Sequence, residues 1–286
     1  MRIIKKAYKK IVVVAVVASL MACSNEEPLT KSELDTSTPQ MSDLDRWIAT
    51  NYVDTYNISV VYKWDQNTVD NERFLFPPTE SKVEPALDVV KRIWLDSYST
   101  IAGPQFVKFY TPRELVLIGG SNLNPAGTVT LGFAEQGVRV VLFEIDLLNK
   151  KSAPSVKRFI ETIQHEYAHI LNQTKPFDEL VYSKITPVGY TAAWNQTTTA
   201  AARQQGFITA YAKASVTEDF AEMVATMLTT PKADYNNLVN ALPDIPKAAI
   251  RAKEAQVVKY YKDAFNIDFY ALRDIAELNT FNVINN

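Results

Sequence analysis

Apolar residues recur at helical spacing along most of the second half of the chain, whereas β-branched runs lie mainly in the first half. A spacing of three to four residues predicts helices. Helices are expected over residues 42–52, 83–98, 155–173, 197–205, 215–229, 235–242, 245–265 and 269–281. Strands are expected over residues 58–64, 115–118, 128–133 and 138–145, the last two forming a hairpin. This order predicts an α+β fold with a small mixed sheet and a mainly helical C-terminal part from about residue 231.

The first 41 residues have the features of an export signal followed by a tether. Residues 1–10 carry five basic side chains, and the apolar run that follows is too short to span a bilayer as a helix. Leu20-Met21-Ala22-Cys23 resembles the lipobox of bacterial lipoproteins, and Cys23, the only cysteine, has no disulfide partner within the chain. We predict a signal peptide over residues 1–22, a lipidated Cys23 and flexible tether over residues 23–41, and one domain over residues 42–286. The alternative is an ordinary signal peptide with an incidental cysteine.

The sequence His165-Glu166-Tyr167-Ala168-His169 lies in the helix predicted over residues 155–173. These are the only two histidines of the chain, and their spacing places both on one helical face, where they can bind one metal ion. The apolar residues of this helix lie opposite, so the histidines are expected to face a polar cleft. Zinc at such a site activates a water molecule, and Glu166 is placed to take its proton. The alternative is two solvated histidines on a helix surface.

A third ligand is needed, because catalytic zinc usually has three protein ligands and a water. The chain has no third histidine and no second cysteine, so a carboxylate is expected. Glu218 and Glu222 share one stripe of the helix predicted over residues 215–229, opposite its apolar face. We predict that Glu218 completes the zinc site and that Glu222 holds a ligating imidazole from behind. Alternatively, Glu218 only takes part in a capping box with Ser215, and Glu222 is solvated.

Two segments resemble those of known metallopeptidases. Residues 211–222 resemble the third-ligand region of anthrax toxin lethal factor and related Glu-type zincins, in which a tyrosine precedes the ligand glutamate by seven residues. Together with the lipobox and the stretch over residues 165–173, they resemble a family of zinc metallohydrolase lipoproteins that accompany TonB-dependent importers in Bacteroidetes. The resemblance implies a zincin-like fold. The roles that it implies are zinc ligation by His165, His169 and Glu218, general base catalysis by Glu166, and oxyanion stabilisation by Tyr211.

The same resemblance implies a place at the bacterial outer membrane. Residues 24–27, which follow Cys23, resemble the acidic signals that direct lipoproteins to the cell surface in such bacteria. The expected partners are a peptide or glycoprotein substrate, the outer membrane through the lipid anchor, and a TonB-dependent receptor with its surface lipoprotein. A formal net charge of −2 provides no basic field, so no nucleic acid is expected among them.

Three functions fit these residues. The first is a cell-surface zinc peptidase that cleaves extracellular peptides or glycoproteins for import. The second is a non-catalytic substrate-binding lipoprotein of an import complex, against which Glu166 argues because binding alone needs no base. The third is a zinc hydrolase of a non-peptide amide bond, since the same attack by water serves both reactions.

Three further expectations concern the surroundings of the site. In zincin-type peptidases an edge strand ahead of the motif helix pairs with extended substrate, and residues 138–145 are the candidate strand. Their apolar run fits an interior strand equally well. The irregular segment over residues 174–207 is expected near the site, as a specificity loop or lid. A basic stripe that includes Lys253 is expected to be a solvated face.

Overall fold

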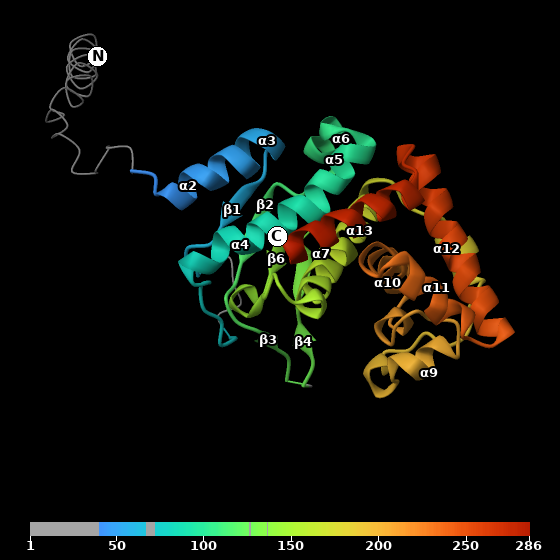
Figure 1. The fold of residues 1–286 in the computed structure, drawn as a ribbon. Coiled ribbons are helices and arrows are strands. Elements are labelled where there is room, and N and C mark those ends of the chain that lie inside the picture. Colours follow the sequence, from blue (N-terminus) through green and yellow to red (C-terminus); the bar gives the residue numbers. More distant parts are fainter. Residues whose placement is uncertain (1–39, 67–71, 126, 136) are drawn as a thin grey trace, which may run out of the picture. The chain divides into compact units, whose positions relative to one another are not determined.

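A small mixed sheet lies beside the first helices of the fold (Figure 1). The computed structural model describes residues 40–66, 72–125, 127–135 and 137–286, so the predicted signal peptide, Cys23 and nearly all of the tether lie outside it. The sheet has the order β1-β2-β6-β5, with β1, β2 and β6 parallel and β5 antiparallel to β6. Its strands are β1 (Ser59–Val61), β2 (Glu114–Leu117), β5 (Gly132–Glu135) and β6 (Arg139–Leu142). A separate two-stranded sheet consists of β3 (Asn122–Leu123) and β4 (Val129–Thr130).

Strands β1 and β5 are the two edges of the described sheet, and β6 is an interior strand. The candidate edge strand over residues 138–145 is therefore wrong, and the interior alternative is correct. Val140, Val141 and Leu142 are almost fully buried, because helices cover one face of β6 and the other face packs against the side chains of Leu75 and Phe133. A strand that is buried on both faces has a continuous apolar run instead of an alternating one.

The helices dominate the rest of the chain. In order they are α2 (Asp43–Ile48), η1 (Ala49–Val53), α3 (Asp54–Tyr56), α4 (Glu80–Val90), η2 (Lys91–Leu95), α5 (Asp96–Ala102), α6 (Pro104–Tyr110), η3 (Ile145–Leu147), α7 (Ala153–Thr174), α8 (Glu179–Ser183), η4 (Trp194–Gln196), α9 (Thr199–Arg203), η5 (Tyr211–Lys213), α10 (Val216–Thr229), α11 (Lys232–Asn240), α12 (Asp244–Phe265) and α13 (Phe269–Asn285). The predicted α+β class, with its helical C-terminal part, is confirmed. None of the described helices is long and apolar enough to cross a membrane.

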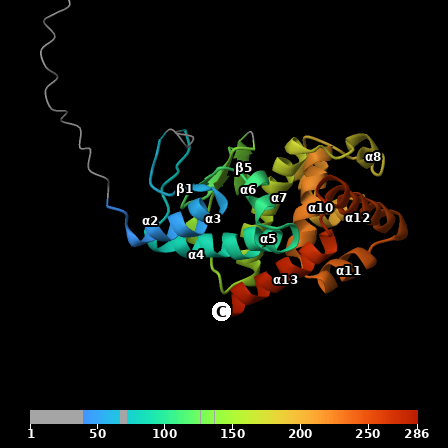
Figure 2. The same ribbon diagram turned by 90° about the horizontal axis from the view of Figure 1, so that it is seen from above.

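Helix α7 occupies the centre of the domain, between the sheet and the C-terminal helices (Figure 2). Its amphipathic sequence explains this position, because one face buries large apolar side chains while the other carries polar residues. Tyr167 on the buried face packs edge-on against Trp94 and Tyr98, with ring centroids 5.1 and 4.9 Å apart. Strand β5 and helix α10 pack against α7. The polar face of α7 therefore lies between an edge strand and a second helix.

Candidate metal centre

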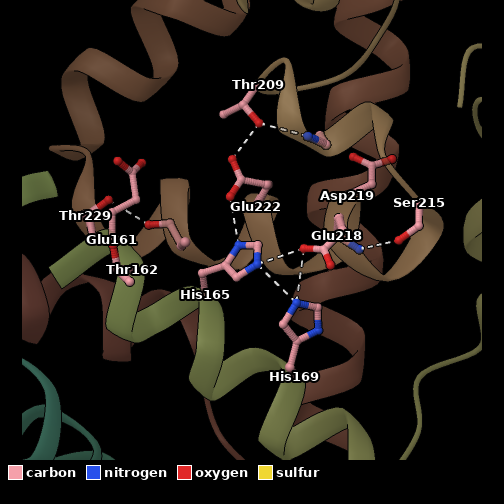
Figure 3. A network of polar contacts seen from close by, with 12 residues as sticks. Glu161, Thr162, His165, His169, Thr209, Ser215, Glu218, Asp219, Glu222 and Thr229 are labelled. Carbon is pink, nitrogen blue, oxygen red and sulfur yellow. Dashed lines mark hydrogen bonds and ion pairs between the residues drawn. The ribbon is translucent and has the colours of Figure 1, made fainter. Parts of the chain in front are cut away.

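Two helices bring together three of the predicted site residues (Figure 3). Helix α7 carries His165 and His169, and α10 carries Glu218. Oε2 of Glu218 lies 2.9 Å from Nε2 of His165 and 3.2 Å from Nε2 of His169, and the two imidazole nitrogens are 3.1 Å apart. Among the described residues, these form the group of His, Cys, Asp and Glu side chains that is close enough to hold one metal ion. The arrangement predicted from helical spacing is therefore present.

The geometry and chemistry of this group fit zinc. Ligand atoms around tetrahedral zinc, with bonds of about 2.0 Å, lie about 3.3 Å apart, close to the separations seen here. Burial alone would lower the pKa of His165, but hydrogen bonds to the Glu218 and Glu222 carboxylates raise the pKa to about 10. Burial alone would raise the pKa of Glu218, but hydrogen bonds to both histidines hold it well below its usual range. Two imidazole nitrogens and a carboxylate therefore lie close together, and the electrostatic potential around them favours positive charge, as a cation site requires.

Glu222 lies on the other side of the His165 ring from Glu218 and His169 (Figure 3). Its Oε1 is 2.8 Å from Nδ1 of His165, and its Oε2 accepts a hydrogen bond of 2.5 Å from the Thr209 hydroxyl. A carboxylate at Nδ1 keeps the proton on that nitrogen and leaves the Nε2 lone pair for a metal. The structure thus places Glu222 where the sequence predicted it, and adds Thr209, for which the sequence carried no signal.

Glu166 is held between the metal site and the edge strand. Its Oε2 accepts a hydrogen bond of 2.9 Å from the backbone N–H of Ala134 in β5. Burial raises the pKa of Glu166, and the nearby His165 and His169 only partly offset this effect. A raised pKa brings a carboxylate closer to the pH at which it can accept a proton and release it again.

Tyr211 lies in the short helix η5 before α10 and lines the same cleft as His165. Its ring centroid is 5.7 Å from that of His165, and Trp194 packs edge-on against it at 4.8 Å. Burial and the nearby carboxylates of Glu218 and Glu166 raise the pKa of Tyr211 well above its usual value, so its hydroxyl keeps the proton. Tyr211 is therefore a protonated hydrogen-bond donor whose hydroxyl reaches the Glu218 carboxylate.

A cleft of about 480 Å³ opens beside this group, and its lining includes His165, Glu166, Tyr211 and Glu222 but neither His169 nor Glu218. We call it the catalytic cleft, and it is lined by α7, the β3–β4 segment, Trp194 and η5. The cleft-facing residues of α7 are Arg158, Glu161, Thr162, His165 and Glu166, so the polar face of α7 looks onto this cleft at His165, whereas His169 does not line it. Trp194 belongs to the irregular segment over residues 174–207, so part of that segment lies at the site as expected.

Lys253 corrects the prediction of a solvated basic stripe on α12. It is fully buried, and its ammonium lies 2.6 Å from Oδ2 of Asp219, which is fully buried as well. It also donates a hydrogen bond of 2.8 Å to the carbonyl of Gly206, while the Tyr190 hydroxyl donates to Asp219 at 2.9 Å. Helical periodicity placed Lys253 beside exposed lysines, but only the partner on α10 explains its burial. These contacts tie α12 to the residue that directly follows Glu218.

The comparisons with known proteins agree with this geometry. Residues 37–270 match a family described as "Putative zinc-binding metallo-peptidase". The crystal structure of a "putative zinc-binding metallo-peptidase" from Bacteroides caccae is 32% identical, with a TM-score of 0.72, over 89% of this chain and 98% of that one. Among curated proteins no significant match is found. Because the match spans most of the chain, the protein belongs to this family of zinc-binding metallopeptidases, and zinc is its cofactor.

Proposed function

We propose that the protein is a zinc peptidase in which His165, His169 and Glu218 hold the metal and Glu166 transfers the proton. The observation that carries this proposal is the hydrogen bond from the Ala134 N–H to Glu166. It holds a carboxylate beside the metal ligands and next to the strand edge where an extended peptide can bind. A protein that only bound its substrate would have no need of a base in this position.

The free edge of β5 provides the substrate-binding backbone. The Phe143 N–H donates to the Leu131 carbonyl at 3.0 Å, so the alternation of antiparallel pairs directs the backbone groups of Phe133 and Glu135 toward β6. Those of Gly132 and Ala134 then face the free edge, where the Ala134 N–H donates to Glu166 and the Gly132 N–H and the two carbonyls face the position of a peptide. A peptide that adds to this edge binds mainly through its main chain, with little demand on its sequence.

Each side chain then has one task in the reaction. Bound zinc supplies Lewis acidity, which makes water nucleophilic near neutral pH and polarises the substrate carbonyl. Glu166 accepts the proton of the attacking water and later donates it to the leaving amine. Tyr211 donates a hydrogen bond to the oxyanion that develops on the attacked carbonyl. Glu222 keeps the His165 imidazole in the orientation and tautomer that ligation needs.

The proposed setting is the bacterial cell surface. The lipobox ending at Cys23 and the acidic residues after it support a lipid anchor in the outer membrane and exposure to the outside. We propose that the protein cleaves peptides or glycoproteins there, and that a TonB-dependent receptor with its surface lipoprotein takes up the products. The resemblance of the two motif segments is the support for this partnership.

The proposal is tested by turnover on a peptide library and on a panel of glycan amides. We expect peptide cleavage that is lost on treatment with a chelator and restored by zinc, because the metal provides the electrophile. Mass spectrometry of the products identifies the bond that breaks. Cleavage of the glycan amides alone would replace the peptidase by a hydrolase of non-peptide amides. Binding of peptides without cleavage of either panel would favour the substrate-binding lipoprotein.

Tyr211→Phe tests the role of the tyrosine. We expect kcat to fall about 100-fold with zinc content unchanged, which is the usual effect of removing one oxyanion donor. The ring and its contact with Trp194 are kept in this variant, so packing does not change. Steady-state kinetics and elemental analysis of the purified variant provide the two readouts. A variant with wild-type kcat would show that Tyr211 serves only in packing.

A further inference from the structure

A second pocket continues the catalytic cleft along the first half of α7. It has a volume of about 420 Å³ and shares Leu131, Arg158 and Thr162 with the catalytic cleft. We call it the apolar pocket. Its apolar lining residues are Leu131, Phe143, Leu147, Leu148, Pro154 and Phe159. The proposed mechanism makes no use of this pocket.

The charged residues at the rim of the apolar pocket neutralise each other. Arg158 donates hydrogen bonds of 3.0 to 3.2 Å from Nε and Nη2 to the Glu144 carboxylate, which also accepts a hydrogen bond from Ser121. The pocket therefore presents apolar walls without an unpaired charge, which suits an apolar side chain. Leu147 is 63% exposed although it lines this pocket. An apolar occupant would bury this side chain, which is favourable because apolar surface is removed from water.

The direction of β5 determines which end of a substrate reaches this pocket. Gly132 lies against Thr162, since a Cβ on Gly132 would be 2.7 Å from Cγ2 of Thr162, and two residues later Ala134 contacts Glu166. Strand β5 therefore runs in the same direction as α7. A peptide that pairs antiparallel with β5 runs the opposite way, from Glu166 toward the start of α7. The part of the substrate on the carboxyl side of the cleaved bond then lies along the apolar pocket.

The dimensions of helices and strands indicate which substrate residue reaches the apolar pocket. Arg158 is the middle one of the five α7 residues that line the apolar pocket, and it lies seven residues before His165, or about 10 Å along a helix with a rise of 1.5 Å per residue. An extended peptide covers this distance in about three residues. Side chains alternate between the two faces of a strand, so the first and third residues after the cleaved bond point the same way. The first then enters the catalytic cleft and the third enters the apolar pocket.

We propose that the apolar pocket is a specificity subsite that binds an apolar side chain of the substrate, three residues to the carboxyl side of the cleaved bond. This inference rests on the proposed peptidase function. The ligand class is a polypeptide with Leu, Ile, Phe or Met at that position, and short peptides that end before it lose the interaction.

The test uses fluorescence-quenched decapeptides that differ only at the third residue after the cleaved bond. We expect the zinc-loaded wild-type protein to cleave the leucine peptide with about tenfold higher kcat/KM than the glutamate peptide. Leu147→Glu should remove this preference and favour lysine at the same position. Peptides that end two residues after the cleaved bond should be cleaved equally by both proteins. Leu180→Glu is the matched control, because Leu180 is 76% exposed on α8 and lines neither pocket.

The same peptides show whether the subsite proposal or the peptidase proposal is wrong. Their dissociation constants are measured by fluorescence anisotropy on Glu166→Gln, with and without Leu147→Glu. Tighter binding of the leucine peptide that depends on Leu147, without any cleavage by the wild type, would retain the subsite and overturn the peptidase. Cleavage that is indifferent to Leu147→Glu would overturn the subsite alone. A Leu147-dependent preference on the amino side of the cleaved bond would also overturn it, because the substrate would then run parallel to β5.

Discussion

Glu166→Gln is expected to lower kcat by about three orders of magnitude while the protein keeps its zinc. General acid–base catalysis contributes about 10²- to 10⁴-fold, and an amide cannot accept the proton of the attacking water. Glutamine has the shape of glutamate, and its amide oxygen can still accept the hydrogen bond from the Ala134 N–H. Glu166 is not part of the group of metal ligands, so the metal site itself is unchanged. Turnover on the best library peptide and zinc content by elemental analysis are measured on the same preparation.

Glu179→Gln provides the control for this variant. Glu179 is exposed in α8 and does not line the catalytic cleft, so Glu179→Gln makes the same replacement at a distance from the site. It should cleave at the wild-type rate. A Glu166→Gln protein with wild-type kcat would contradict the mechanism, and equal losses of activity and zinc would show that Glu166 supports metal binding instead.

Glu218→Ala is expected to weaken zinc binding by more than about 100-fold and to abolish turnover at ordinary zinc concentrations. Replacing a residue that only supports a ligand already costs 10- to 100-fold in affinity, and Glu218 would be a ligand itself. The helix should persist, because the capping hydrogen bond to Ser215 comes from the backbone N–H of residue 218 and alanine keeps it. Elemental analysis and competition with a chelator measure stoichiometry and affinity, and circular dichroism checks that the fold is intact.

The zinc content of the wild type and of Glu218→Ala separates a zinc hydrolase from a substrate-binding protein. The wild type should hold one zinc per chain, and Glu179→Ala should match it. Wild-type affinity in Glu218→Ala would remove Glu218 from the ligand set. If the wild type bound no zinc after reconstitution, the substrate-binding lipoprotein would become the better explanation of the cleft.

Most of the local structure follows from residue periodicity. The helices that carry His165 and Glu218 were predicted with ends within a few residues of those observed, because their apolar residues recur on one face over many turns. The strands are less clearly marked in the sequence. Residues 128–133 were predicted as one strand, but the structure divides this region between β4 and β5, which belong to different sheets. Short strands carry too few residues for a periodic signal, and their partners are distant in the sequence.

The position of a strand within the sheet also depends on its neighbouring strands and not on its own sequence. The apolar run of β6 could belong to an interior strand or to an edge strand that pairs with substrate. Its neighbours β2 and β5 make it interior and leave the backbone of Gly132 and Ala134 at the free edge. The hydrogen bond from Ala134 to Glu166 then follows from the packing of β5 on α7. Nothing in residues 132–135 themselves indicates it.

The sequence by itself determined which helix carries both histidines, and that any zinc site they form needs a carboxylate to complete it. A chain with two histidines, four residues apart on an amphipathic helix, and no second cysteine leaves a carboxylate to complete a zinc site. The tertiary structure alone decided which groups surround that site: the edge strand at Glu166, Thr209 behind Glu222, and Lys253 buried against Asp219. Periodicity reports which face of a helix is apolar. The partner that meets a polar face depends on contacts between segments far apart in the chain, which no local pattern contains.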